Sequence, residues 1–242
     1  MMRTISPSSP ADHNGTPSFP TSFPPMPDRL CRDIVDFCNK HHTTCRETRF
    51  HPKSIIIEES ATAHYTFLVR HGTVKLSKSM PNGRSQIVGF VGSGHILGTS
   101  SQDVYMFQAE AITDVTVNRL SRTMFEDILV NAPDILSRLL EETTAQLVMI
   151  QDRLLALGRK TAREKLASFL LREATRNNGS NIHLPFSLQM SRADIADYLG
   201  LSTETVSRLM SMFHQEKVIH RSRQVIQLLA PSHLAAMACT IL

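Results

Sequence analysis

Residues 190–210 read MSRADIADYLGLSTETVSRLM, and this stretch predicts two short helices joined by a sharp turn. Ser191 is a good N-cap, and Asp194 follows three residues later at the capping-box spacing. Gly200 supplies the turn, because only glycine takes a positive φ angle without strain. Ser202 or Thr203 can cap the second helix. The stretch therefore predicts a helix-turn-helix.

The second helix of this pair has two different faces. Apolar residues recur at helical spacing on one face, namely Val206, Leu209, Met210 and Phe213. Polar residues recur on the opposite face, namely Glu204, Ser207, Arg208 and Ser211. A guanidinium can bind O6 and N7 of guanine, a carboxylate can accept from N4 of cytosine, and a hydroxyl can serve either role. This face predicts base contacts by Glu204, Ser207 and Arg208.

An ordinary amphipathic helix pair with a solvated face is the alternative interpretation. Small Ala196 where the helices cross, with Gly200 four residues later and Val206 ten residues later, favours the DNA-reading motif. We assign the following residues to the motif besides the three base-contact candidates: Ser191, Arg192, Ala196, Gly200, Ser202, Thr203, Thr205 and Ser211.

Residues 217–228 contain two short β-branched runs that flank a basic turn. This pattern is typical of the wing of a winged helix. Arg221 and Arg223 in the turn region are candidates for contacts with DNA phosphates. Such contacts add salt-dependent affinity and position the protein, but they read no sequence.

The charge of the chain also points to a polyanionic partner. The 242 residues carry a net charge of +4, yet residues 158–242 alone hold 11 Lys and Arg against 6 Asp and Glu. No apolar run reaches the roughly 18 residues of a membrane span, and no secretory signal opens the chain. We therefore expect a cytoplasmic protein with no membrane partner. No nucleophile–base arrangement or zinc motif suggests an enzyme.

The N-terminal part predicts a tail and then a β-rich domain. Residues 1–27 hold seven of the twelve prolines, which predicts a disordered Pro/Ser-rich tail. Residues 28–46 have a helical apolar pattern. Several short strand signals with glycine-containing turns between them then predict a β-roll within a domain of residues 28–130: 55–57, 65–69, 73–77, 86–90 and 115–117.

Residues 131–157 predict one long helix. Apolar residues at steps of three or four make it a candidate for a coiled-coil-like dimer seam, formed by Ile135, Leu139, Leu147, Ile150 and Leu154. A single helix packed on its own domain is the alternative. Gly158 is expected to break the helix and to open a DNA-binding domain of residues 158–242. The fold class is α+β: a β-roll, a long dimerisation helix and a winged helix-turn-helix.

This order of elements resembles the Crp/Fnr superfamily of bacterial transcription regulators. Residues 69–76 (VRHGTVKL) resemble the strand–glycine–strand pattern of the superfamily, and residues 82–90 (NGRSQIVGF) resemble its next hairpin. Residues 92–98 (GSGHILG) resemble its glycine-rich turn before the sensor pocket. The resemblance covers about residues 48–230. It implies a homodimer that binds double-stranded DNA and works with RNA polymerase.

Glu204, Ser207 and Arg208 match the Glu-x-x-Ser-Arg pattern of the Fnr/FixK branch. The resemblance implies the palindrome TTGAT-N4-ATCAA, with Arg208 on the guanine, Glu204 on its paired cytosine and Ser207 on a thymine. The hairpin of residues 83–90 looks most like the FixK branch. That branch activates microaerobic respiration and nitrogen-fixation genes, and an oxygen-responsive two-component system regulates its synthesis.

The resemblance leaves two alternatives that involve a bound ligand. A cyclic-nucleotide-binding interaction module would need a Glu and an Arg-Ser pair, which are absent after Gly98. A redox- or oxygen-sensing Fnr-type regulator would need four thiolates on an iron–sulfur cluster. Cys31, Cys38 and Cys45 are spaced seven residues apart, and seven residues of helix rise about 10.5 Å; Cys239 is far away in sequence. We therefore predict no cofactor and no metal site, and we expect the cysteines to be ordinary thiols.

Overall fold

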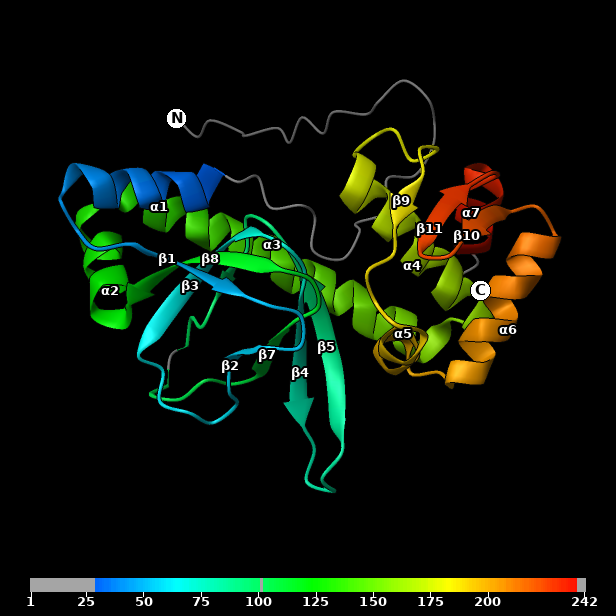
Figure 1. Ribbon diagram of the computed structural model, residues 1–242, viewed down its shortest axis with the longest axis horizontal. Coiled ribbons are helices and arrows are strands. Elements are labelled where there is room, and N and C mark those ends of the chain that lie inside the picture. The colour runs from blue at the N-terminus through cyan, green and yellow to red at the C-terminus, as the bar shows by residue number, and fades with distance from the viewer. Residues whose placement is uncertain (1–28, 101, 239–242) are drawn as a thin grey trace, which may run out of the picture.

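The computed structural model describes residues 29–100 and 102–238. The predicted tail of residues 1–27 and Cys239 lie outside the described residues. Figure 1 shows a β-rich N-terminal half and a smaller C-terminal half, with one long helix running from the first to the second. This is the α+β arrangement that the sequence predicts.

The N-terminal half is a roll of two four-stranded antiparallel sheets. One sheet has the order β1-β8-β3-β6 and the other has the order β2-β7-β4-β5. The strands are β1 (Arg46–Phe50), β2 (Ile55–Ile57), β3 (Tyr65–His71), β4 (Val74–Ser79), β5 (Ser85–Val91), β6 (Ile96–Leu97), β7 (Gln108–Ala111) and β8 (Val115–Ser121). Their inward side chains, among them Phe67, Val69 and Val117, form one apolar core.

A second apolar cluster attaches three helices to this roll. The helices are α1 (Arg29–Lys40), α2 (Arg122–Asn131) and the first turns of α3 (Pro133–Arg159). Leu30 and Ile34 of α1 meet Leu68 of β3 and Leu120 of β8, and Phe125 of α2 joins them. An ion pair between Asp33 of α1 and Arg138 of α3 ties the two helices together at the surface. The start of α3 is therefore part of the N-terminal domain.

This packing corrects the sequence-based description of α3. Ile135 keeps only 6% of its surface exposed within the cluster, and Leu139 packs against the same cluster. Neither side chain is free to form the seam predicted for it, because both are used inside their own domain. The helix also passes through Gly158 and ends at Arg159. A single glycine costs a helix only about 1 kcal/mol, and the chain leaves the helix where Thr161 caps the next one.

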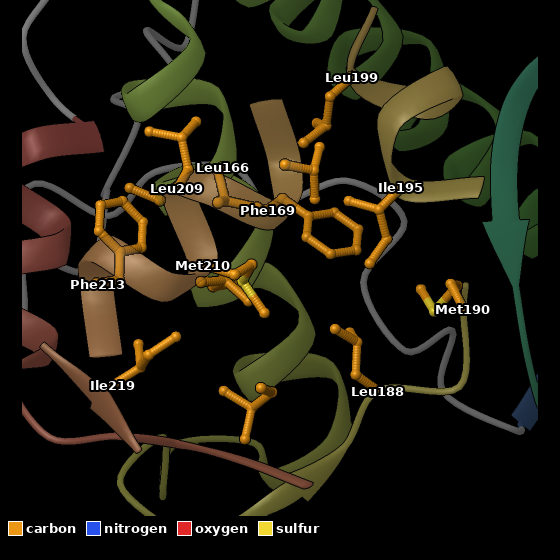
Figure 2. Close-up of a cluster of buried hydrophobic side chains, with 14 of the residues drawn as sticks. Leu166, Phe169, Leu188, Met190, Ile195, Leu199, Leu209, Met210, Phe213 and Ile219 are labelled. Carbon is orange, nitrogen blue, oxygen red and sulfur yellow. The ribbon is translucent and has the colours of Figure 1, made fainter. Parts of the chain in front are cut away.

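The C-terminal half is a small three-stranded sheet with four helices around it. Its elements are α4 (Ala162–Asn178), β9 (Phe186–Ser187), α5 (Arg192–Leu199), α6 (Thr203–Gln215), β10 (Ile219–Ser222), β11 (Val225–Leu228) and α7 (Pro231–Ala238). The sheet has the order β10-β11-β9. Figure 2 shows side chains from α4, α5, α6 and the strands converging on one core, among them Phe169, Ile195 and Phe213.

The roll and the C-terminal half touch through β4, β5 and α5. The carboxylate of Asp197 on α5 accepts a hydrogen bond from the backbone N–H of Ile87 at 2.6 Å. The backbone carbonyl of Asp197 accepts another from the side-chain amide of Gln86. The rings of Phe90 and Tyr198 lie 5.1 Å apart. Lys75 of β4 pairs with Asp194, at 3.5 Å, and with Glu110 of β7. The β4–β5 hairpin thus holds the first helix of the helix-turn-helix.

Gly72 gives a test of the turn between β3 and β4. It has φ +94°, and a Cβ there would lie 2.3 Å from the backbone oxygen of Asp114. Gly83 also has a positive φ, of +77°, but a Cβ there would meet nothing within 4 Å. We expect Gly83→Ala to lower the free energy of unfolding by roughly 1–2 kcal/mol, because alanine is strained in the left-handed region. Gly72→Ala should lower it by about 1–3 kcal/mol more, because its Cβ also overlaps the backbone of Asp114. Urea unfolding of both variants measures the difference, and equal losses would contradict it.

Candidate DNA-binding surface

The first helix of the motif begins with the predicted capping box. The backbone N–H of Asp194 donates to Ser191 Oγ at 3.0 Å, and the backbone N–H of Ser191 donates to the Asp194 carboxylate at 3.2 Å. Both N–H groups would otherwise have no partner at the helix start. Ile195 and Ala196 are buried, and Ala196 lies where α5 packs on the motif core. The cap therefore sets where α5 begins.

Gly200 ends α5 and turns the chain toward α6. It has φ 63° and ψ 43°, in the left-handed region that glycine tolerates best. The N–H of Leu201 donates to the carbonyl of Ala196 at 2.9 Å, which closes the turn. Ser202 then caps α6, and its Oγ accepts from the N–H of Thr205 at 3.1 Å. Of the two caps that the sequence allows, Ser202 is the one used, and Thr203 is exposed in the first turn.

The second helix buries one face and leaves the other free. Val206, Met210 and Phe213 are fully buried in the core of the C-terminal half, and Leu209 is nearly so. Glu204 and Arg208 are exposed on the other side, whereas Ser207 is partly buried. Ser211 is also partly buried, and its hydroxyl donates to the carbonyl of Ser207 at 3.0 Å. The structure thus leaves Glu204 and Arg208 as the long polar side chains on the free face.

The charge on Glu204 fits a role as a hydrogen-bond acceptor. Its pKa lies below its usual value, because its own backbone N–H and the Ser202 hydroxyl at the helix start donate to the carboxylate. The group is therefore charged at neutral pH. A charged carboxylate can accept from the N4 amino group of cytosine.

The predicted wing is a β-hairpin. Strands β10 and β11 are antiparallel: Ile219 pairs with Leu228 at one end, and Ser222 pairs with Val225 at the other. Strand β9 adds a third strand next to β11. Arg223 stands in the tight turn with φ 52° and is exposed. Arg221 lies on β10 and is partly buried. The hairpin thus presents one arginine at its tip and another along its strand.

The structure also gives Arg192 a neighbour that sequence spacing does not reveal. Burial lowers the pKa of its guanidinium, and the positive charge of Arg221 lowers it further. Within the described part of the chain, Nη1 of Arg192 is buried and has no hydrogen-bond partner. The positive charges of Arg192 and Arg221 therefore act on each other, and no carboxylate is bonded to that nitrogen. A phosphate between them would relieve their repulsion.

The interior of the roll does not fit a cyclic nucleotide. Tyr105 is buried there, donating to the carbonyl of Tyr65 at 2.8 Å and accepting from its N–H at 3.1 Å. The segment of residues 99–107 contains no Lys or Arg. Among the described residues of the roll no Lys or Arg is buried as a whole, and Arg70 of β3, which has one buried guanidinium nitrogen, is partly buried. A buried phosphate needs cationic or N–H partners, so the residues present do not match this ligand.

Cys31, Cys38 and Cys45 do not lie on one continuous helix, as the sequence-based argument assumes. Cys31 and Cys38 are both on α1, but α1 ends at Lys40 and Cys45 stands beyond it. Cys38 and Cys45 belong to one apolar cluster, and each thiol shifts the pKa of the other. The helical-rise argument that separates these two residues is therefore wrong, because the chain turns back between them. Among residues 29–100 and 102–238, no group of three or more His, Cys, Asp or Glu side chains could hold a metal ion.

Comparison with known proteins identifies the family. The family of Crp-like helix-turn-helix domains matches residues 164–237, and the cyclic nucleotide-binding domain matches residues 47–132. Transcriptional activatory protein AadR of Rhodopseudomonas palustris is 36% identical over 194 residues, which cover 80% of this chain and 81% of AadR. The chain belongs to the Crp/Fnr family of transcription regulators.

Two further proteins match this chain over most of its length. Nitrogen fixation regulation protein FixK of Bradyrhizobium diazoefficiens is 37% identical over 191 residues, covering 77% of this chain and 78% of that protein. The solved structure of FixK2 from Bradyrhizobium japonicum has a TM-score of 0.75 at 32% identity and covers 82% of this chain and 100% of its own. These matches confirm the predicted family and fold.

The family also confirms the predicted class of function. This Crp/Fnr protein is a DNA-binding transcription regulator, and its family is not one of enzymes. Regulators of the family bind DNA and act as dimers. Across the described helices, none combines the length and apolar character that a membrane crossing requires.

The N-cap of α6 gives a test of the motif. Ser202→Ala removes the acceptor for the N–H of Thr205, and we expect a loss of about 1 kcal/mol in the free energy of unfolding. Thr203→Ala is the matched control, because Thr203 is exposed one residue later and does not cap the helix. Thermal or urea unfolding compares the two variants. A loss from Thr203→Ala as large as that from Ser202→Ala would contradict this assignment.

Proposed function

We propose that this regulator is a homodimeric transcriptional activator that reads the palindrome TTGAT-N4-ATCAA through α6. The free face of that helix carries the proposal. Glu204 and Arg208 project from it, Ser207 lies between them, and the apolar face is fixed in the core. The carboxylate of Glu204 suits cytosine as an acceptor, and the forked guanidinium of Arg208 suits guanine. The small hydroxyl of Ser207 suits thymine.

Contacts with the DNA backbone would come from the wing and from the start of α5. Arg223 is exposed at the hairpin tip, and the positive charge of Arg221 on β10 acts on Arg192 at the start of α5. We assign these residues to phosphates, because their placement at the edge of the motif suits positioning rather than base reading.

The middle of α3 supports the proposed dimer. Exposed apolar residues occur there with the spacing of the a and d positions of a coiled coil, except that Thr143 stands between the second and third of them: Leu136, Leu140, Leu147, Ile150 and Leu154. Leu140 is 66% exposed and Leu154 is 64% exposed, a high exposure for leucines on one helix face. Leu147, Ile150 and Leu154 of the predicted seam fit this face, and Leu136 and Leu140 take the places assigned to Ile135 and Leu139.

The biological role follows from the relatives. Their names describe a transcriptional activatory protein and regulators of nitrogen fixation. We propose that this protein likewise works with RNA polymerase in the cytoplasm to activate microaerobic or nitrogen-fixation genes. Since the roll lacks groups suited to a cyclic nucleotide, its activity would be set mainly by its abundance.

Arg208→Ala tests the base contact. On a duplex with the palindrome, we expect a loss of about 1–3 kcal/mol per half-site, or about 5–150-fold in affinity, because one guanine loses its guanidinium partner. On a duplex in which that guanine is replaced, the variant should bind about as well as the unchanged protein. Fluorescence anisotropy with both duplexes measures the affinities. Equal losses on the two duplexes would show that Arg208 does not read the base.

Arg223→Ala is the matched comparison for a phosphate contact. It should weaken binding to both duplexes alike. The slope of log K against log salt concentration should become shallower by about 0.9 for each phosphate that the variant no longer neutralises. A sequence-dependent loss with an unchanged salt slope would contradict the assignment of Arg223 to the backbone.

Leu147→Glu tests the seam. A charge at the centre of the exposed apolar face should dissociate the dimer, because a buried unpaired carboxylate is strongly unfavourable. Ala145→Glu is the matched control, since Ala145 is exposed on the same helix but stands on the side away from Leu147. Sedimentation velocity reports the oligomeric state. A dimer that persists in Leu147→Glu, or dissociates equally in Ala145→Glu, would overturn the proposed seam.

A further inference from the structure

Two cysteines separated by seven positions in the sequence meet at the end of α1. After Lys40 the chain reverses, with His42 at φ 51° and the N–H of Thr43 bonded to the carbonyl of Cys38 at 2.9 Å. This reversal returns Cys45 to the apolar cluster that holds Cys38, and each thiol shifts the pKa of the other. Both side chains belong to the same apolar cluster.

The two thiols differ in their surroundings. Cys38 is fully buried between α1 and the roll, whereas Cys45 is only partly buried at the edge of the cluster. The side chain of Asn118 on β8 also hydrogen-bonds to Cys45, and the positive charge of Arg70 on β3 acts on it. Cys45 is therefore the thiol that a small polar reagent can reach.

The same contacts divide the roles of the two sulfur atoms. The hydrogen bond from Cys38, followed by that from Asn118 and the charge of Arg70, lowers the pKa of Cys45 to about 7. The same hydrogen bond and burial raise the pKa of Cys38 far above its usual range. Cys45 is thus the thiol that ionises near neutral pH, and Cys38 stays protonated. Thiolates are the nucleophilic form of cysteine.

Cys31 provides an internal comparison. It is on the same helix seven residues before Cys38, a rise of about 10.5 Å. Cys31 is fully buried, and its thiol donates to the carbonyl of Gly94 at 3.2 Å. That hydrogen bond joins Cys31 to a backbone oxygen, whereas the Cys45 thiol interacts with the Cys38 thiol and with Asn118. The features of Cys45 therefore belong to its position rather than to this region as a whole.

We propose that Cys45 and Cys38 form an oxidisable dithiol that reacts with a hydroperoxide and closes to a Cys38–Cys45 disulfide. Cys45 is the attacking residue and Cys38 is the resolving residue. This modification site is additional to DNA binding and does not involve an iron–sulfur cluster. Both side chains lie in one apolar cluster at the end of α1, and closure requires their Cβ atoms to come within about 3.5–4.5 Å of each other.

The chemistry balances in two steps. The Cys45 thiolate attacks one oxygen of the hydroperoxide, so an S–O bond forms, the O–O bond breaks, and the departing oxygen takes a proton. Cys45 is then a sulfenic acid. Cys38 loses its proton and attacks the Cys45 sulfur, the S–S bond forms, and the S–O bond breaks with release of water. The two thiols lose two electrons, and hydrogen peroxide is reduced to two molecules of water.

Peptide mapping tests the site in the full-length protein. Trypsin places the four cysteines in separate peptides, which are 30–32, 33–40, 41–46 and 224–242. After treatment of the reduced protein with hydrogen peroxide and alkylation of remaining thiols, we expect peptides 33–40 and 41–46 to be linked and two hydrogens lighter than their sum. Peptide 30–32 should remain alkylated. If Cys38 and Cys45 stay alkylated, or are linked to other cysteines, the proposal is wrong.

Two variants separate the assigned roles. In Cys38→Ser, Cys45 should stop at the sulfenic acid and be trapped by dimedone. In Cys45→Ser, Cys38 should stay reduced. Cys31→Ser is the matched control, since a hydroxyl can still donate to Gly94, and it should form the disulfide as the unchanged protein does. Dimedone labelling of Cys38 in Cys45→Ser, at the extent seen for Cys45 in Cys38→Ser, would overturn the assignment of Cys45 as the attacking thiol. Circular dichroism confirms that each variant is folded before treatment.

Discussion

The burial of one face of α6 is the constraint on which the DNA-reading surface depends. Val206, Met210 and Phe213 are fully buried against α4 and α5, so the helix cannot rotate without exposing them. Burying each such side chain is worth about 1.5–3 kcal/mol. The opposite face is consequently fixed toward solvent, and Glu204 and Arg208 are presented at a defined angle. The fold thereby orders the base-reading groups before DNA is present.

The long helix α3 connects this surface to the roll in two different ways. Its first turns are core of the N-terminal domain, with Ile135 packed beside α1 and α2. Its middle turns expose an apolar face that no part of the described chain covers. Separate contacts between β5 and Asp197 of α5 hold the helix-turn-helix against the roll. Helix α3 thus combines domain packing with a surface for a second copy, whereas β5 places the motif.

The strands that the sequence predicts and those that it does not predict differ in their local signals. Strands β3, β4 and β5 are rich in β-branched or aromatic residues, and the sequence predicts their positions closely. Strand β7 reads QAEA and β1 reads RETRF, which have little β-propensity, and β6 has only two residues. Those strands form because neighbouring strands supply hydrogen-bond partners. Likewise, periodicity locates apolar residues on α3 but does not separate Ile135, which faces the core, from Leu136, which faces solvent.

The sequence by itself determined the parts that depend on neighbours within a few residues. These are the capping box at Ser191, the left-handed turn at Gly200 and the two faces of α6, since caps and helical periodicity are local. Only the tertiary structure decided which thiols meet and which charges face each other. Cys45 returns toward Cys38 because the chain reverses after α1, and the positive charge of Arg221 on β10 acts on Arg192 of α5, almost thirty positions earlier. Such contacts depend on how separate elements pack, and residue spacing carries no record of that packing.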